Sequence, residues 1–335
     1  MLEGLKPLAQ RIREERKRLE ENATEIRRDD GPLPGLDEGR LVIPMENARD
    51  DLSVCAVDGG LLADRFVGSD ILVRRSVAVC FVYKEGRLAS VEHHPKKFPE
   101  NEVGFRNGLD EHEALVFRSL FRLRGEIDTA AEALDRFKPD YLLLDGSLMP
   151  LASDKPGDGS ALREDYDSLL ASYRKLYEKC DSLKCQLVGV VKDSRGKRLA
   201  DVLKGRLLSD VPDAVLADAL LKEGERTSAM THGGDPQKGL GEWGGRMRLF
   251  YTKPSGVDIP LRIEFLSQKK SAADVASSIY ALSSISRAFA YPAALIEADM
   301  CAALGPLEMD KIKRSLFALT GGAARPLRRA ERPFR

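Results

Sequence analysis

The sequence lacks several features that would settle its class at once. It has no run of 18 apolar residues, which excludes an ordinary membrane-spanning helix. Its first residues, MLEGLKPLAQRIREERKRLEE, carry no apolar signal core, which predicts a cytoplasmic protein. The four histidines are scattered, and the five cysteines include one close pair, Cys180 and Cys185, which argues against a zinc site. Basic and acidic residues number 53 each, so net charge indicates no class of partner.

The residues that are present predict a folded α/β protein. Hydrophobic residues make up 43% of the 335 residues, which is enough for a sizeable core. Buried strands are expected at 53–58, 70–84, 140–148 and 185–194, and helices at 109–137 and 161–180. Antiparallel strands followed by alternating strands and helices predict a ribonuclease-H-like mixed sheet flanked by helices.

Both ends of the chain are expected to add to this core. Residues 5–29 predict a charged amphipathic helix, which RDDGPLPGLDEG interrupts with proline and glycine. Beyond 194, RMRLFYTK and IPLRIEFL predict further strands, and helices are expected near 270–289 and 292–304. We therefore predict an N-terminal helical extension over 1–40, a ribonuclease-H-like domain over 41–310 and a basic tail over 311–335.

Acidic residues follow the predicted buried strands. SVCAVDGGLL places Asp58 after one strand, DYLLLDGSL places Asp145 after a second, and Lys192 and Asp193 follow a third. Asp-Gly is also a common turn signal, so each aspartate taken alone favours a turn. In open α/β sheets, however, sites form at the carboxyl ends of strands. Taken together, these residues favour a site.

Two predicted helices carry acidic residues that face inward. In DEHEALVFRSLFRLRGE, Glu113 shares a face with apolar residues three, four and seven positions later, whereas Glu111 lies with arginines. An inward glutamate requires a partner, either an arginine or a bound cation. The helix YPAALIEADMCAAL is apolar nearly all round, which predicts burial, so Asp299 within it needs a reason. Glu297 in the same helix fits a surface position.

A shared site would explain these acidic side chains. Carboxylates that lie close together repel one another and ionise together only around divalent cations. Oxygen ligands suit Mg²⁺ or Mn²⁺. Two such ions about 4 Å apart activate water and stabilise the leaving oxygen of a phosphodiester. We therefore expect Asp58, Glu113, Asp145 and Asp299 to converge on metal.

The chain resembles the NurA family of archaeal and bacterial nucleases. The resemblance rests on VCAVDGG, YLLLDGSL, LVGVVKDS, PLRIEFL and YPAALIEAD, in the family's order and rough spacing, over residues 50 to 305. It implies a ribonuclease-H-like homodimer with manganese-dependent 5′→3′ exonuclease activity on DNA and endonuclease activity on single strands. It also implies a hexameric HerA-type translocase as partner in the resection of double-strand breaks.

The resemblance also implies roles for particular residues. Metal ligands carry over onto Asp58, Glu113 and Asp145, and Tyr291 carries over as an active-site tyrosine. Many members of the family have histidine where this chain has Asp299, although aspartate is a competent oxygen ligand. Lys192 would contact a phosphate, or else pair with a carboxylate such as Asp193.

Basic residues near the third strand suit an anionic substrate. KDSRGKRLADVLKGR places Lys192, Arg195, Lys197 and Arg198 beside the predicted acidic site, although a solvated helix face has the same pattern. The single tryptophan, Trp243, lies in a glycine-rich segment and fits either base stacking or packing equally well. The basic RPLRRAERPFR segment fits contact with DNA, with a partner or with neither.

Two other functions use similar patterns. Sugar kinases and actin-like proteins use Asp-Gly turns to hold nucleotide phosphates, but this chain lacks a duplicated second core and an adenosine motif. A non-catalytic adaptor of a translocase would carry a degenerate acidic set, and the departure at Asp299 is the feature that favours it. Binding of ATP would support the first alternative. DNA binding without metal-dependent cleavage would support the second.

Overall fold

The computed structural model describes residues 2–29, 31–47, 51–66, 68–192, 194–233, 239–268 and 270–325. The chain divides into two compact units. The first unit comprises Met1–Arg49, Val188–Gly234 and Gly245–Ala293, and the second comprises Asp50–Leu187, Asp235–Gly244 and Ala294–Arg335. The predicted domain limits remain a prediction. Residues 326–335 of the predicted basic tail lie outside the described residues.

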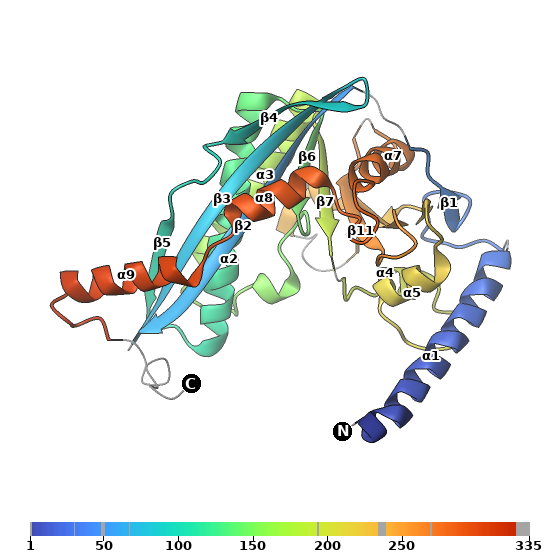
Figure 1. The fold of residues 1–335 in the computed structure, drawn as a ribbon, viewed down its shortest axis with the longest axis horizontal. Coiled ribbons are helices and arrows are strands. Elements are labelled where there is room, and N and C mark those ends of the chain that lie inside the picture. Colours follow the sequence, from blue (N-terminus) through green and yellow to red (C-terminus); the bar gives the residue numbers. More distant parts are fainter. Residues whose placement is uncertain are drawn as a thin grey trace. The chain divides into compact units, whose positions relative to one another are not determined.

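The first unit contains antiparallel strands and the N-terminal helix (Figure 1). Its strands lie in the order β1 (Val42–Pro44), β8 (Glu225–Thr227), β10 (Met247–Lys253), β11 (Leu261–Leu266) and β7 (Gln186–Val191), with β9 (Met230–Thr231) beside β10. Residues 188–191 of β7 pair with β11. The helices of this unit are α1 (Leu2–Arg28), α4 (Arg198–Val202), α5 (Asp213–Leu220) and α7 (Ala272–Ser283). The last two residues of α6 (Glu242–Arg246) also belong to it and lead into β10.

Helix α1 buries only the C-terminal half of its apolar stripe. Leu19 and Ile26 pack in one core with residues of α4, α5 and β10, among them Leu216. Leu5 and Ile12, in the N-terminal half, are 52% and 54% exposed. Tertiary packing therefore holds the second half of this helix, while its first half relies on local pairs such as Arg11–Glu15.

The second unit is built on a mixed sheet with strand order β6 (Tyr141–Asp145), β2 (Leu52–Phe66), β3 (Ser69–Lys84) and β4 (Arg87–His94), and β5 (Glu102–Asn107) also pairs with β3. Strands β2, β3 and β4 form an antiparallel meander, and β6 runs parallel to β2. Helices α2 (Glu111–Phe137), α3 (Arg163–Leu183), α8 (Ala293–Ala302) and α9 (Pro306–Leu319) and the short 3₁₀ helix η1 (Ala152–Asp154) complete the unit. In Figure 1, α2 lies behind the β2–β3 ribbon and α8 lies in front of it.

The sequence predicted that strand β2 ends at Asp58, and this prediction is wrong. The strand continues for eight more residues, and Asp58, Gly59 and Gly60 pair in register with Val77, Ser76 and Arg75 of β3. The glycines serve close packing on the two faces of the sheet instead of a turn. A Cβ atom on Gly59 would lie 2.8 Å from the Glu126 side chain of α2, and one on Gly60 would lie 2.1 Å from the Ala302 carbonyl oxygen of α8.

Helix α8 is not buried all round, which corrects the prediction from its apolar sequence. Leu295, Ala298 and Cys301 are buried, whereas Asp299 and Met300 are exposed. The helix packs on the sheet through one side only, so the burial predicted from its apolar composition was too extensive. Among the helices that the structure describes, none combines the length and the apolar character needed to cross a membrane.

Candidate metal centre

Three aspartates of the second unit meet in one place. Strand β2 pairs in parallel with β6 so that Val57 lies opposite Leu144, which places Asp58 and Asp145 side by side. Asp299 of α8 completes the group, and one carboxylate oxygen from each of the three lies within 4.8 Å of the others. They line a pocket of about 350 Å³. Its other lining residues are Gly59, Gly60, Arg122, Ala302 and Ala303.

The electrostatics of this group are unfavourable without a cation. Burial, the neighbouring Asp145 charge and the nearby Asp299 raise the pKa of Asp58 to about 7, although the Gly59 amide donates to Asp58 Oδ1 at 2.7 Å and opposes the shift. Asp58 is 8% exposed, so water screens it poorly. The protein's own hydrogen bonds therefore do not balance the charge of an ionised Asp58. Three converging carboxylates fit a hard divalent cation.

A fourth carboxylate, Glu126 of α2, lies against this group and was not predicted. It is 7% exposed, and its side chain lies beside Gly59. Burial raises the pKa of Glu126 to about 8; the Arg122 guanidinium lowers it, and the Asp58 charge raises it further. Its register carried a signal, because buried Leu123, Ala130 and Ala133 lie three residues before and four and seven after it.

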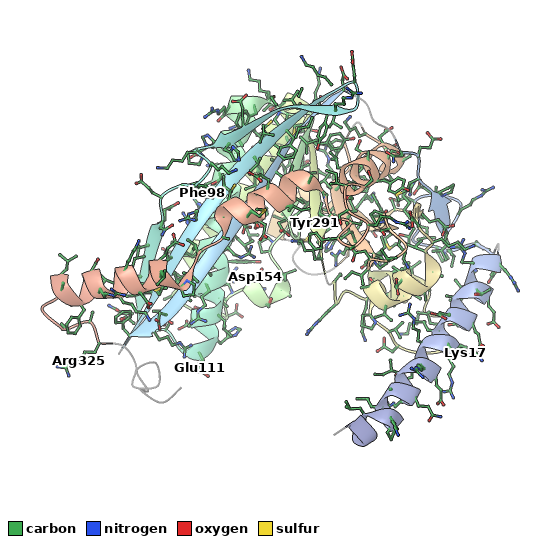
Figure 2. All side chains as sticks on the ribbon, in the orientation of Figure 1. Lys17, Phe98, Glu111, Asp154, Tyr291 and Arg325 are labelled. Atoms are coloured by element: carbon green, nitrogen blue, oxygen red, sulfur yellow. The ribbon has the colours of Figure 1, made fainter. Side chains whose placement is uncertain are left out.

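Glu113 lies elsewhere, at the N-terminal end of α2. It forms a capping box: Asp110 Oδ1 accepts from the Glu113 amide at 2.8 Å, and the Asp110 amide donates to Glu113 Oε2 at 3.4 Å. Ser160 Oγ also donates to Glu113 Oε1 at 2.6 Å. Glu111 is exposed at the same end of the helix (Figure 2). The first helical turn leaves amides without partners, and an acidic residue at its third position satisfies one of them.

Lys192 and Tyr291 belong to the first unit, where the structure brings them together. The Lys192 ammonium lies 4.2 Å from the centroid of the Tyr291 ring. Tyr291, labelled in Figure 2, is 2% exposed, and its hydroxyl donates to the Val190 carbonyl oxygen at 3.1 Å. This contact fixes the tyrosine against β7 and places its ring beneath the lysine that follows that strand.

The predicted DNA-binding arginines and lysine differ in their surroundings. Arg195 is exposed. Lys197 forms an ion pair with Asp210. Arg198 donates to the carbonyl oxygen and hydroxyl of Thr231 at 2.9 and 2.8 Å. Asp193 lies outside the described residues.

Trp243 is buried, which favours the packing interpretation over base stacking. The residue is 7% exposed, and its ring centroid lies 5.9 Å from that of Tyr177. A base needs an open aromatic face on which to stack. The composition of the surrounding segment gave no sign of this burial, because glycine-rich segments also occur at the surface.

Comparison with known proteins places the fold. The profile of the NurA domain matches residues 52–304. The crystal structure of the NurA nuclease from Sulfolobus solfataricus is similar at a TM-score of 0.61 and 17% identity, over 95% of this chain and 94% of that chain. A structure of NurA bound to dAMP and manganese is similar at a TM-score of 0.57 and 12% identity, over 95% and 97%. No curated protein matches the sequence. These likenesses confirm the predicted ribonuclease-H-like α/β fold class.

Proposed function

The chain belongs to the NurA family of nucleases, and we propose that it cleaves DNA with divalent metal held by Asp58, Asp145 and Asp299. The observation that carries this proposal is the convergence of three carboxylates within 4.8 Å in one pocket. Bound manganese or magnesium supplies a water nucleophile at neutral pH and neutralises charge on the phosphodiester. The relative bound to dAMP and manganese supports manganese as the ion.

Each acidic residue contributes a distinct property to this site. Asp58 is held in the middle of a paired strand, so its carboxylate has a fixed base. Asp145 comes from the end of the neighbouring parallel strand. Asp299 comes from a helix surface and is the most exposed of the three. Two ligands thus come from strands, with Asp58 buried and Asp145 half-buried, whereas the third borders solvent, where a phosphodiester can approach.

We propose Glu126 as a fourth acidic group of the site, in the helix role that the sequence assigned to Glu113. Glu126 is buried beside Asp58 and would add a negative charge to the site once ionised, whereas Glu113 is engaged by Asp110 and Ser160. Arg122 pairs with Glu126 across one helical turn and also lines the pocket. Arg122 therefore orients Glu126 and offers a positive charge to a phosphate.

The basic residues that follow β7 are proposed to hold the DNA backbone. Lys192 is presented above the Tyr291 ring. Arg195 is exposed and so accessible to a phosphate. Lys197 and Arg198 already have partners within the protein, so we assign them a smaller part. We assign Trp243 a packing role and no contact with DNA.

The function is tested by cleavage of DNA labelled at one end. Single- and double-stranded substrates are incubated with the purified chain in Mn²⁺, Mg²⁺ or EDTA. We expect metal-dependent cutting that Asp58→Asn abolishes. Asp64→Asn is the matched control, because Asp64 lies on the same strand, outside the acidic group, and pairs with Lys313. Cutting that persists in EDTA or in Asp58→Asn contradicts the proposal.

We further propose the finer properties that the family resemblance implies. These are 5′→3′ polarity, single-strand endonuclease activity, two metal ions, a homodimer, a cytoplasmic location and action with a HerA-type translocase in resection of double-strand breaks. The position of the label in the cleavage products measures polarity. Cutting that requires the translocase and ATP supports the partnership, whereas binding of DNA without cutting under all conditions supports an adaptor.

A further inference from the structure

A second group of ligand-type side chains lies in the second unit, outside the acidic pocket. His93 comes from β4, and Glu297 and Cys301 come from one face of α8, four residues apart. His93 Nε2 lies 3.2 Å from Glu297 Oε1, and Cys301 Sγ lies 3.6 Å from the same oxygen. One potential ligand atom from each residue lies within 4.8 Å of the others. The three side chains thus already have the spacing of ligands around one small ion.

The donor atoms of this group differ from those of the acidic pocket. An imidazole nitrogen, a thiol sulfur and a carboxylate oxygen together suit a borderline-soft cation such as zinc, whereas three carboxylates suit magnesium or manganese. We propose that His93, Glu297 and Cys301 form a zinc site with three protein ligands and one open position. The ligands are 204 and four residues apart, so no short sequence spacing announces the site.

A lysine, Lys97, pairs with the carboxylate of this proposed zinc site in the structure. The Lys97 ammonium lies 3.0 Å from Glu297 Oε1, the oxygen that His93 and Cys301 also approach. The Lys97 side chain is 54% exposed, whereas those of His93 and Glu297 are 16% and 24% exposed. An exposed ion pair is weak, so a lysine on a flexible stem can return to water when a divalent cation enters. Lys97 therefore acts as a competitor for the site.

A cation here would fasten helix α8 to strand β4. Residue 299 lies two positions from both Glu297 and Cys301, so Asp299 projects from the opposite side of the helix. Fixing one face of α8 against the sheet would hold Asp299 in place toward Asp58. The zinc site itself does not depend on the proposed nuclease function; only this consequence for Asp299 does.

Cobalt is the probe for the test, because a thiolate bound to Co²⁺ gives a charge-transfer band in the near ultraviolet. The full-length protein is titrated with Co²⁺ alone, and Zn²⁺ is then added to displace it. We expect a thiolate band that zinc removes, that Cys301→Ser abolishes and that His93→Ala weakens at least tenfold in affinity. Circular dichroism of each variant verifies the fold, and His93→Ala carries the test if Cys301→Ser does not fold.

Three variants make the assignment specific. Lys97→Ala removes the competitor and should tighten Co²⁺ binding about two- to fivefold. Asp58→Asn should leave the band unchanged, which separates this site from the acidic pocket whether or not the protein cleaves DNA. Cys180→Ser should also leave it unchanged, since Cys180 lies beside Cys185 and is none of the three proposed ligands. Absence of a band, a band that persists in Cys301→Ser, or a Lys97→Ala variant with unaltered affinity would overturn the proposal.

Discussion

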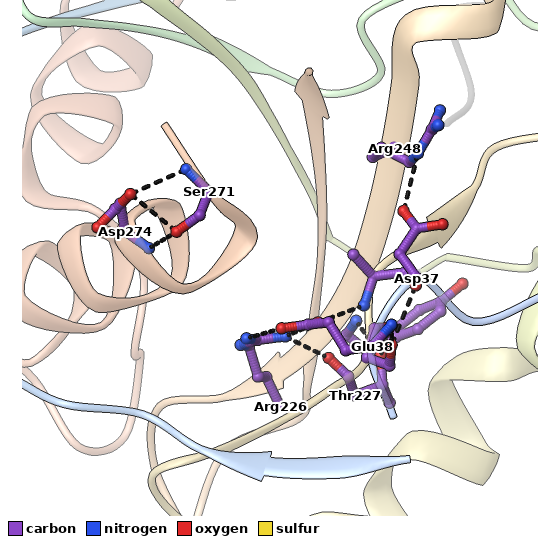
Figure 3. A network of polar contacts seen from close by, with 10 residues as sticks. Asp37, Glu38, Arg226, Thr227, Arg248, Ser271 and Asp274 are labelled. Carbon is purple, nitrogen blue, oxygen red and sulfur yellow. Dashed lines mark hydrogen bonds and ion pairs between the residues drawn. The ribbon is translucent and has the colours of Figure 1, made fainter. Parts of the chain in front are cut away.

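Two buried charged groups, Arg226 of the first unit and Asp58 of the second, have opposite surroundings. In the first unit, Arg226 is 2% exposed at its side chain and forms a two-pronged ion pair with Glu38, at 2.6 and 2.7 Å (Figure 3). In the second unit, Asp58 lies among acidic neighbours that raise its pKa to about 7. A charge that the protein itself neutralises supports the fold. A carboxylate that lies among other carboxylates favours the binding of a cation.

The same contrast holds for aspartates. Asp213 of the first unit is fully buried and accepts from three donors: the amides of Leu199 and Ala200 at 3.0 and 2.9 Å and the Tyr251 hydroxyl at 2.7 Å. Asp58 is nearly as buried, yet it accepts from the Gly59 amide and lies beside the acidic Asp145 and Asp299. Burial alone therefore does not mark a functional carboxylate. The surroundings of the carboxylate, whether donors or further acids, distinguish the two roles.

Among the variants that test this contrast between the two units, Asp58→Asn is expected to have the largest effect, which is on cleavage. The change removes a direct ligand at nearly constant volume, so cleavage with Mn²⁺ should fall by more than the roughly 10- to 100-fold that loss of an outer-shell partner costs. Unfolding without metal should need at least as much urea as the wild type, because a repelled charge is gone. Lower stability together with retained cleavage would reverse the roles assigned to the two units.

Glu38→Gln should produce the opposite pattern. It leaves the buried Arg226 guanidinium without its anion, and removing one partner of a buried pair costs about 3–5 kcal/mol. Glu38 is 30% exposed, so we expect the lower end of this range. The urea midpoint of the transition that reports the first unit should fall. A midpoint equal to that of the wild type would mean that water compensates Arg226 in place of Glu38.

The pH dependence of stability should reveal the acidic pocket. Burial raises the pKa of Asp58 to about 7 and that of Glu126 to about 8, above their values of about 4 in an unfolded chain. The folded state then binds more protons at these two acids, so their contribution to stability in EDTA is fully present near pH 4 and is lost as pH rises to about 8, by at most about 1.4 kcal/mol per pH unit for each acid.

Mn²⁺ should flatten this slope, because a cation favours the ionised carboxylates. Thermal unfolding at several pH values, with EDTA and with Mn²⁺, measures both slopes. The matched variant is Asp58→Asn, which should lose part of the slope in EDTA. A stability that rises steadily from pH 5 to 8 in EDTA would show that paired carboxylates elsewhere outweigh the pocket.

The smallest effect is expected from Gly60→Ala. The added methyl group would meet the Ala302 backbone at 2.1 Å, so the end of α8 must move, at a cost of about 1–3 kcal/mol. That movement should also weaken Mn²⁺ binding, because α8 carries Asp299. Gly39→Ala is the control, since a Cβ atom there has nothing within 4 Å. Calorimetric titration with Mn²⁺ compares the two variants, and equal affinities would show that α8 tolerates the shift.

Local patterns in the sequence predicted the elements better than they predicted the ends of those elements. Alternation and apolar runs located β3, β6 and α2 because burial imposes these periods. The end of β2 was wrong because Asp-Gly-Gly is a turn signal in isolation. Gly59 and Gly60 are needed because Glu126 and Ala302 pack closely against them. This requirement comes from tertiary packing, and a short stretch of sequence around the glycines does not reveal it.

The candidate site was predictable in part for the same reason. Asp58 and Asp145 follow from strand order, because parallel neighbours bring equivalent positions together. Glu113 was predicted and Glu126 was not, although both have apolar neighbours at helical spacing. What separates them is the capping box at Asp110, which depends on where α2 begins. Helix beginnings are among the least certain features of a sequence-based prediction.

The position of Asp58 inside a long paired ribbon has a consequence for motion. A residue at a strand end moves with the loop that follows it, on timescales of nanoseconds to microseconds. Asp58 has paired residues on both sides, and β2 and β3 remain in register from Leu52 opposite Tyr83 to Phe66 opposite Ser69. Its amide should therefore exchange with deuterated water only when the ribbon itself opens. The Asp58 carboxylate is thus anchored as firmly as the sheet, so a change in its distance from Asp145 must come from the Asp145 side, where β6 ends and a loop begins.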